Sequence, residues 1–405
     1  MLWKRKGFFL IKMCTNQPPW ALYIHWPFCL SKCPYCDFNS HVHNTIPVDR
    51  FKTAFLTELE TQQNRLKRNT PLQSIFFGGG TPSLMPPQLV ADLIQKAKQH
   101  FYTTDSLEIT LEANPTSFEK EKFQAFKEAG VNRLSLGVQS FNDQDLAFLG
   151  RGHNAREAEA ALEACAALFP RFSFDLMYGL ANQATKDWQQ QLQKAAVFQP
   201  THLSCYQLTF EQGTAFYTRF QRGDLKYPNE TKAIAFDTQT EIFLAEKGLR
   251  RYETSNYAAP GFESQHNLAY WKTHPTLGIG PGSHGRPMLH TKPYAEQMLR
   301  APFTWLEAVE KQGHGLQKSS MLSQEERLQE WFLMGLRLKE GLATEDALRI
   351  TGKPFTTWYK GPLQERLETL SQQGLLCIDP KKMRIHTTKK GALRLNGILS
   401  FLFAA

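Results

Sequence analysis

Three cysteines, Cys29, Cys33 and Cys36, lie within eight residues in the segment FCLSKCPYCDF. Their C-x3-C-x2-C spacing gives one loop three thiolates, one fewer than the four ligands that soft metals usually take. Three thiolates from one loop can ligate three irons of a [4Fe–4S] cluster, which leaves the fourth iron open for a substrate. The spacing therefore favours an iron–sulfur centre with one open position.

Two other readings of the cysteines remain open at this point. A zinc ion could take the three thiolates together with His25 or His41. A thioredoxin-like Cys33–Cys36 redox pair requires a helix that begins at the motif, and Pro34 and Asp37 disfavour one there.

A glycine-rich segment, FFGGGTP, is the second feature with chemical meaning. Gly78, Gly79 and Gly80 end a predicted strand and precede Thr81 and Pro82. Consecutive glycines allow the backbone to approach a ligand closely and present its bare N–H and C=O groups. A simple turn would need one glycine, so three indicate a binding loop.

Residues 20–210 alternate between strand-like and helical patterns, which predicts parallel strands with crossover helices. The expected strands are 21–25, 74–77, 107–112, 133–138, 172–178 and 202–207. The expected helices are 49–67, 86–100, 117–129, 156–168 and 186–198. Six such units form either a doubly wound sheet or an incomplete (β/α) barrel.

Side-chain alternation favours the barrel. In LEITLEA (107–113) apolar residues alternate with Glu108, Thr110 and Glu112, and RLSLGVQ (133–139) and FSFDL (172–176) repeat the pattern. Both faces of a doubly wound sheet lie under helices, so its strands should be almost continuously apolar. A polar inner face predicts an open, water-filled barrel, with Glu112, Gln139 and Asp175 near the carboxyl ends of its strands.

Length and composition limit the remaining possibilities. The chain has 405 residues, enough for two or three domains, and a formal charge of +9 that selects no class of partner. Seven cysteines, mostly scattered, are typical of a reducing compartment, and no apolar run reaches the roughly 20 residues of a membrane span. We therefore expect a cytoplasmic protein, and Met13 is an alternative start.

The pattern along the chain predicts four regions. Residues 1–19 form an N-terminal extension that we expect to be disordered, and residues 20–210 form the barrel. Residues 211–315 form an irregular connecting region rich in glycine, proline, histidine and asparagine. Residues 316–405 contain three helices and a hairpin, which resemble a winged helix.

Together these motifs resemble the radical S-adenosylmethionine (SAM) superfamily, in which the open iron chelates SAM. The segments LYIHWPFC, FGGGTPS, LEANP, RLSLGVQSF, LGRGH, DLMYGL and LSCYQLT are similar to those of the oxygen-independent coproporphyrinogen III oxidases and their relatives. This resemblance implies a partial (β/α)6 TIM-like barrel, with a C-terminal winged-helix-like α+β domain. It also implies SAM contacts from Tyr23, Tyr35, Gly79, Gly80, Thr81, Glu112, Gln139, Arg151 and Asp175.

Two features separate the chain from the oxidases themselves. The oxidases carry a further cysteine two residues after the third, and here that position is Phe38. The segment HNLAYW also matches the H-N-x-x-Y-W motif of the HemW-type haem chaperones. The resemblance implies that His266 binds haem iron, that Tyr270 and Trp271 stack on the macrocycle, and that Asn267 orients the site.

The expected function is therefore haem binding and transfer to haem-accepting apo-proteins, with a [4Fe–4S] cluster and SAM as cofactors. The expected assembly is a monomer or homodimer, with peripheral contact at the inner membrane. One rival is oxidative decarboxylation of coproporphyrinogen III, and another is a DNA-binding regulator that senses redox state through the cluster. No nucleic acid partner is expected, because the basic residues near the C-terminus fit a solvated face.

One further motif fits a loop better than a binding fingerprint. The segment GPGSHG satisfies the G-x-G-x-x-G spacing of dinucleotide-binding proteins at Gly280, Gly282 and Gly285. It contains Pro281 and is followed by no helical pattern, so it lacks the context that the motif requires. We expect these glycines to shape a loop near the mouth of the barrel.

Overall fold

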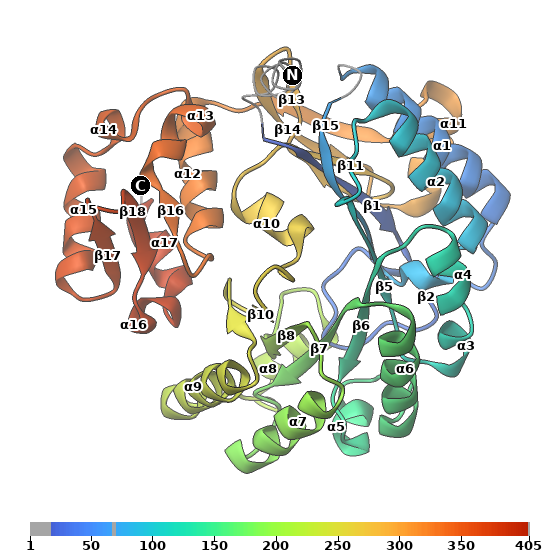
Figure 1. Cartoon of the computed structure of the whole chain (residues 1–405), viewed down its shortest axis with the longest axis horizontal. Helices are drawn as coiled ribbons and strands as arrows, with labels where there is room; N and C mark the ends of the chain where they lie inside the picture. The colour runs from blue at the N-terminus through green and yellow to red at the C-terminus, as the bar shows by residue number, and fades with distance from the viewer. Residues whose placement is uncertain (1–17, 67–69, 404–405) are drawn as a thin grey trace, which may run out of the picture.

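A computed structural model describes residues 18–66 and 70–403 of the chain. The predicted N-terminal extension falls almost entirely on residues 1–17, outside the described residues. The largest element is a curved nine-stranded sheet in the order β11-β1-β4-β5-β6-β7-β8-β10-β9, with helices along its outer side (Figure 1).

Six parallel strands follow one another in chain order through the middle of this sheet. They are β1 (Trp20–Trp26), β4 (Leu72–Gly79), β5 (Glu108–Ala113), β6 (Arg133–Gln139), β7 (Arg171–Tyr178) and β8 (His202–Gln207). The partial (β/α)6 barrel predicted from the alternating pattern is therefore confirmed. The sheet is extended by β11 (Thr276–Ile279), parallel to β1, and by the antiparallel strands β10 (Asn256–Ala258) and β9 (Arg250–Arg251).

Amphipathic helices cover the outer face of the barrel and bury its core. They are α1 (Val48–Asn64), α2 (Pro87–His100), α3 (Ser117–Lys120), α4 (Phe123–Glu128), α5 (Asp143–Phe148), α6 (Ala155–Leu168) and α7 (Thr185–Val197). Alternate strand residues such as Leu22, Ile75 and Leu111 are fully buried in this core. Local signals fix the helix ends, as in the capping box that Asn154 and Glu157 form at the start of α6.

The inner face of the barrel is polar, as the alternation of side chains predicted, but it is not open along its length. Helix α10 (Gln265–Trp271), which carries HNLAYW, lies inside the curve of the sheet (Figure 1). The Oγ atom of Ser74 on β4 lies 3.0 Å from Nδ1 of His266, and Glu108 on β5 accepts a 3.2 Å hydrogen bond from the His266 backbone N–H. The polar inward-facing residues of β4 and β5 therefore bind a helix.

The connecting region forms helices and a small antiparallel sheet. Its elements are α8 (Ala215–Gln221), α9 (Glu230–Glu246), α11 (Pro302–Gln312), β12 (His284–Gly285), β13 (Met288–Leu289) and β14 (Lys292–Met298). The strand β15 (Leu316–Met321) pairs with β14 and completes the small sheet. Trp305 of α11 is fully buried against Phe51 and Phe55, so this region shares the core of the barrel.

A buried carboxylate joins the connecting region to the barrel. Glu58 of α1 accepts hydrogen bonds from the backbone N–H groups of Gly280 (2.7 Å) and Gly315 (2.6 Å) and from Nε1 of Trp305 (3.0 Å). Burial raises the pKa of Glu58 to about 7, although these hydrogen bonds oppose the rise. The GPGSHG segment is thus anchored as a loop beside the barrel, as expected, and no helix follows it.

The C-terminal domain has its own core and the winged-helix-like arrangement that the sequence predicted. It contains α12 (Gln324–Gly335), α13 (Ala347–Thr351), α14 (Phe355–Trp358), α15 (Gly361–Gln372), α16 (Lys389–Ala392), α17 (Leu395–Leu402) and the strands β16 (Leu342–Ala343), β17 (Leu376–Asp379) and β18 (Arg384–Thr387). Its sheet has the order β16-β18-β17, and Trp331, Phe332, Leu367 and Ile385 lie in its core.

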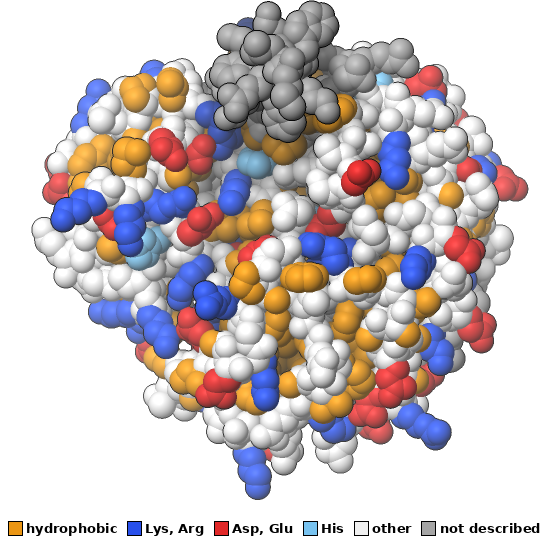
Figure 2. Space-filling view, in the orientation of Figure 1, with side chains coloured by type: hydrophobic (Ala, Val, Ile, Leu, Met, Phe, Trp, Pro, Cys, Tyr) orange, Lys and Arg blue, Asp and Glu red, His pale blue; other side chains and the backbone are white. Residues whose placement is uncertain are grey.

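Several basic residues of this domain form ion pairs with nearby acids. Arg384 pairs with Glu340, Lys389 with Glu241, and Arg394 with Glu230. Figure 2 shows lysines and arginines over this domain and its junction with the barrel, interspersed with acidic and apolar side chains. Within residues 18–66 and 70–403, no helix has the length and hydropathy needed to span a membrane.

Candidate functional site

The three clustered cysteines lie at the mouth of the barrel: Cys29 ends β2 (Phe28–Cys29), and Cys33 and Cys36 are on the loop that leads to β3 (His41–Val42). All three side chains are half-buried, and each sulfur lies beside a potential hydrogen-bond donor. Thr81 Oγ1 lies 3.3 Å from Cys29 Sγ, and Arg151 Nη1 lies 3.5 Å from Cys33 Sγ. Ser40 Oγ lies 3.8 Å from Cys36 Sγ. Donors directed at sulfur stabilise thiolates, as a cluster requires.

The glycine segment packs directly under this loop. The N–H groups of Gly80 and Thr81 donate to the carbonyl oxygens of Trp26 (2.7 Å) and Phe28 (2.8 Å). A Cβ atom on Gly80 would lie 2.7 Å from the Phe28 carbonyl oxygen and 3.0 Å from Cys29 Sγ. The absence of a side chain at Gly80 therefore allows the loop to sit on the end of β4.

The loop fits a cluster better than the two rival centres. Both ring nitrogens of His25 are engaged, Nδ1 with the Tyr23 hydroxyl (2.9 Å) and Nε2 with the Asn39 carbonyl oxygen (2.9 Å). Nε2 of His41 lies 3.2 Å from Asn39 Oδ1, so three of the four ring nitrogens of the two proposed zinc ligands are engaged with groups other than the sulfurs. Residues 30–40 contain no helix, which a thioredoxin-like pair would need.

Two carboxylates lie close together in the barrel: Glu112 is near the carboxyl end of β5, and Asp175 is in the middle of β7, with β6 between the two strands. Burial, and then repulsion from Asp175, raise the pKa of Glu112 to about 8. Burial also raises the pKa of Asp175 to about 6, although a hydrogen bond from Ser204 opposes the rise. The backbone N–H of Gly79 donates to Glu112 Oε2 at 3.3 Å. This region can therefore hold a proton or accept hydrogen bonds from an amine or hydroxyl group.

Arg151 connects the cysteine loop to the strand ends. Its Nη1 contacts Cys33 Sγ and the Tyr35 hydroxyl (3.4 Å), and its Nη2 donates to the Gly137 carbonyl oxygen (2.8 Å) and to Asn114. A forked contact with a ligand carboxylate would need these terminal nitrogens, which the protein already uses. Only Nε lacks a partner among the described residues.

Gln139 ends β6 with a backbone φ of 72°, in the left-handed region that few side chains adopt. Its side chain is buried, and its Oε1 atom has no hydrogen-bond partner within the described part of the chain. Buried polar atoms are nearly always satisfied, so Gln139 Oε1 and Arg151 Nε fit contacts to a bound polar molecule. They support the assignment of SAM contacts in this region.

His266 is buried inside the barrel, where its side chain is only 2% exposed. Aromatic rings surround it. Its ring stacks on Phe76 with centroids 4.7 Å apart, and Tyr23 and Tyr270 lie at 6.1 Å and 5.0 Å. Burial, and then the Arg133 guanidinium, lower the pKa of His266 to about 3. The imidazole is therefore neutral near pH 7, and its Nε2 has no partner among the residues that the structure describes.

The other three predicted haem-site residues of the HNLAYW segment, Asn267, Tyr270 and Trp271, lie on different sides of α10. The Asn267 side chain hydrogen-bonds Tyr252, and its backbone N–H is capped by Ser264 Oγ at 3.3 Å. Tyr270 lines a pocket, whereas Trp271 faces the C-terminal domain, where the Arg337 guanidinium lies 5.5 Å from its ring. The structure therefore does not place Tyr270 and Trp271 on one common surface.

Several of the predicted residues line a pocket of about 380 Å³ at the mouth of the barrel. Tyr23, Gly79, Glu112 and Tyr270 line it, which brings strand-end residues and the HNLAYW helix to one cavity. The SAM and haem assignments made from the sequence do not include the rest of its lining: His25, Phe38, Asn39, Gly282, His284, Gln297 and Arg300. Two of these, Gly282 and His284, belong to the GPGSHG segment. The glycines of that segment were the feature of the sequence that could have identified them as pocket residues.

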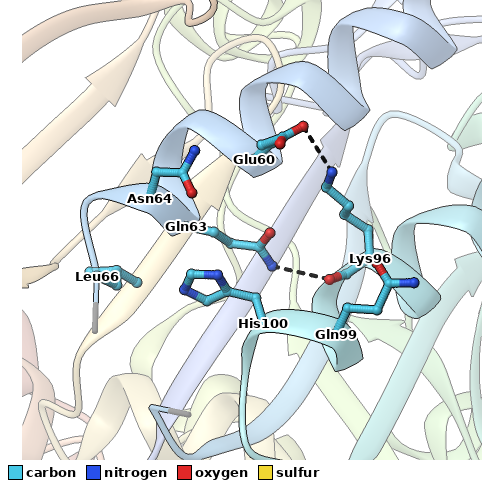
Figure 3. Close-up of a pocket in the computed structure, with 7 residues that line it drawn as sticks. All are labelled: Glu60, Gln63, Asn64, Leu66, Lys96, Gln99 and His100. Atoms are coloured by element: carbon cyan, nitrogen blue, oxygen red, sulfur yellow. Dashed lines mark hydrogen bonds and ion pairs between the residues drawn. The ribbon is translucent and has the colours of Figure 1, made fainter. Parts of the chain in front are cut away.

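A second pocket, of about 300 Å³, lies on the outer side of the barrel between α1 and α2 (Figure 3). Lys96 forms an ion pair with Glu60 across it, and Nε2 of Gln63 donates to the Lys96 carbonyl oxygen. None of the predicted site residues lines this pocket, and three of its polar residues, Glu60, Gln63 and Lys96, are engaged with one another. The pocket at the barrel mouth is therefore the candidate functional site.

Comparison with protein families agrees with this geometry. Residues 23–194 match the model of the Radical SAM superfamily, and residues 322–394 match the HemN C-terminal domain. Among solved structures, coproporphyrinogen III oxidase (HemN) from Escherichia coli superposes with a TM-score of 0.79 over 99% of this chain and 94% of that chain. The two sequences are 20% identical, so this likeness establishes the fold.

Sequence relatives narrow the family. The chain is 35% identical to heme chaperone HemW of Escherichia coli, over 96% of this chain and the full length of that protein. It is 36% identical to heme chaperone HemW of Haemophilus influenzae, over 94% of this chain and 97% of that protein. A mouse protein named radical S-adenosyl methionine domain-containing protein 1, mitochondrial, is 40% identical over 90% of this chain and 83% of its own length. The chain belongs to the HemW family within the radical SAM superfamily.

Proposed function

We propose that this protein is a haem chaperone, which binds haem and transfers it to haem-accepting apo-proteins. The observation that carries the proposal is full-length similarity to proteins named heme chaperone HemW, at 35–36% identity. The HNLAYW helix supports it, because that motif lies beside the pocket at the barrel mouth. Phe38 also stands where the resemblance to the oxidases calls for a cysteine.

His266 has the chemistry of a haem ligand. Haem iron takes a neutral imidazole nitrogen, and burial keeps this ring neutral with Nε2 unpartnered among the described residues. At 2% exposure, however, the ring is separated from the pocket by Tyr23 and Tyr270. Coordination by His266 therefore requires α10 to shift or Tyr270 to turn aside.

We assign the cofactors to the same site at the mouth of the barrel. Cys29, Cys33 and Cys36 would hold a [4Fe–4S] cluster, and Thr81 and Arg151 would stabilise two of its thiolates. SAM would lie against the strand ends, with contacts from Tyr23, Tyr35, Gly79, Gly80, Thr81, Glu112, Gln139, Arg151 and Asp175. When bound, the cluster and SAM supply one-electron chemistry. The protein residues orient the ligand and accept its hydrogen bonds.

The proposal extends to partners and location. We infer a cytoplasmic monomer or homodimer that contacts the inner membrane face peripherally, and a formal charge of +9 is compatible with an anionic lipid surface. Sedimentation with anionic vesicles, set against neutral vesicles, tests the membrane contact. If the protein sediments with neither kind of vesicle, the proposed membrane contact is wrong, and the proposal of haem binding is unaffected.

A haem titration read by Soret absorbance tests the central proposal. We expect wild type to bind haem and His266→Ala to bind it weakly, with an altered Soret band. The exposed His290 provides a matched control as His290→Asn, because asparagine tolerates the φ of 49° at that position. Undiminished binding and an unchanged spectrum in His266→Ala would defeat the ligand assignment.

The rival activity needs its own assay. Anaerobically reconstituted protein is incubated with coproporphyrinogen III, SAM and a reductant. We expect no protoporphyrinogen above background, whereas its formation would restore the oxidase reading. The HemN structure does not decide this question, because a match at 20% identity reports the fold.

A further inference from the structure

The pocket at the barrel mouth has two walls of different chemistry. Tyr23, Gly79 and Glu112 come from the strand ends, where SAM is assigned. The facing residues come from the cysteine loop and the connecting region: Phe38, Asn39, Gly282, His284, Gln297 and Arg300. None of the residues of this second wall belongs to the set assigned to SAM.

The second wall is electropositive. The Arg300 side chain is exposed at the pocket, and no ion pair or hydrogen bond of its guanidinium is found among the described residues. Burial, and then the positive charges of Arg286 and Arg300, lower the pKa of His284. Arg286 itself is held by Glu330 at 2.6 Å, so Arg300 is the arginine left available to an incoming anion.

Arg300 is held in place through its backbone. Nδ2 of Asn39 donates to the carbonyl oxygens of Arg300 and Pro281, both at 2.9 Å. A Cβ atom on Gly282 would lie 2.4 Å from Asn39 Nδ2, so the glycine permits this close packing. These contacts fix the start of the Arg300 side chain relative to the cysteine loop.

An exposed aromatic ring completes the wall. Phe38 is 58% exposed, although phenylalanine is usually buried, and it precedes Asn39 directly. A carboxylate receptor next to an exposed aromatic ring suits a flat apolar molecule with acidic substituents. Haem has this form, with two propionates on one edge of an apolar macrocycle.

We propose that this second wall is the haem propionate subsite, in which Arg300 binds a propionate and Phe38 packs against the macrocycle. The inference rests on the proposed function and specifies how its cargo is held. Tyr270 lines the same pocket, so haem bound there would lie one aromatic layer from His266. The subsite would hold haem before His266 coordinates its iron.

A carboxylate on Arg300 could also come from SAM, so the experiment separates the two sources. Anaerobically reconstituted wild type and Arg300→Gln are titrated with haem, with haem dimethyl ester, and with SAM. We expect Arg300→Gln to weaken haem binding about fivefold, the range for a partly exposed ion pair. Binding of the dimethyl ester should be equal in both proteins, and SAM affinity should not change.

Arg156→Gln is the matched control, because Arg156 is an exposed arginine on α6 away from the pocket. Iron content and circular dichroism establish that each variant is folded and loaded. Phe38→Ala should weaken both haem and its dimethyl ester, since it removes contact with the ring and leaves the propionate contact in place.

Each of the other possible outcomes would contradict a specific part of the proposal. Equal haem affinity in wild type and Arg300→Gln would remove the subsite and leave the proposed function standing. Weaker SAM binding in Arg300→Gln, with haem binding unchanged, would assign the arginine to the SAM carboxylate. Failure of wild type itself to bind haem would remove the proposed function and this inference with it.

Discussion

The hydroxyl oxygen of Ser74 lies 3.0 Å from Nδ1 of His266, and this contact holds the HNLAYW helix inside the barrel. Both side chains are buried, so the hydrogen bond is shielded from water. It also fixes which nitrogen of the ring is engaged and leaves Nε2 as the one available to a metal. The positions of β4 and α10 are thus coupled through one histidine.

Removal of the Ser74 hydroxyl should destabilise the fold. Ser74→Ala leaves a buried ring nitrogen unsatisfied, so we expect the free energy of unfolding to fall by about 1–3 kcal/mol. Urea titration monitored by circular dichroism measures the change. Ser106→Ala, at an exposed serine, should stay within about 0.5 kcal/mol of wild type. Equal effects of the two substitutions would contradict the role given to this contact.

The raised pKa of Glu112 predicts a dependence of stability on pH. The group titrates near 4.5 when unfolded and at about 8 in the folded protein, so between these values only the folded form keeps the proton. Folding therefore becomes less favourable as the pH rises through this window. We expect Glu112→Gln to gain stability relative to wild type, on the order of 2–4 kcal/mol above about pH 8.

Unfolding titrations at about pH 5 and about pH 8.5 measure this difference. Glu121→Gln, at an exposed glutamate, serves as control and should follow the wild-type curve. The same Glu112→Gln protein should bind SAM more weakly, because it has lost a carboxylate acceptor. A difference between wild type and Glu112→Gln that shrinks with rising pH would show that folding does not desolvate the Glu112 carboxyl group.

The close packing of Gly80 predicts that a methyl group there disturbs the cysteine loop. Gly80→Ala places Cβ against the Phe28 carbonyl oxygen and Cys29 Sγ. We expect iron content after reconstitution to fall below about half of the wild-type value while the fold persists. Gly152→Ala is the matched control, since no atom lies within 4 Å of the added carbon. Full iron loading of Gly80→Ala would mean that the loop can move without loss of the cluster.

The contact between Trp271 and Arg337 should slow the coordination of haem iron by His266. If α10 must shift to expose His266, this cation–π contact with the C-terminal domain opposes the shift by about 0.5–1 kcal/mol. Its loss in Arg337→Ala should raise the population of the shifted form, and with it the rate of coordination, about two- to fivefold. Stopped-flow absorbance in the Soret region measures the rate, with Arg156→Ala as control. A slower or unchanged rate would show that α10 does not shift, and would leave rotation of Tyr270 as the way in which His266 becomes accessible.

The sequence alone determined much of the barrel. Alternation in segments such as LEITLEA and FSFDL reports which residues face the core, since successive side chains of a strand point to opposite faces. Parallel strands bring their carboxyl ends to one edge, which is why the strand pattern is enough to group Glu112, Gln139 and Asp175. The cysteine spacing is equally local and needed no tertiary information.

Only the tertiary structure decided how the connecting region meets this barrel. Helix α10 is distant in sequence from β4, and no periodicity indicates that His266 fills the space beside Ser74. The place of Arg300 opposite the strand ends depends on Asn39, more than 250 residues earlier in the chain. Local patterns fix strands and the faces of strands, whereas contacts between distant segments depend on how the whole core packs.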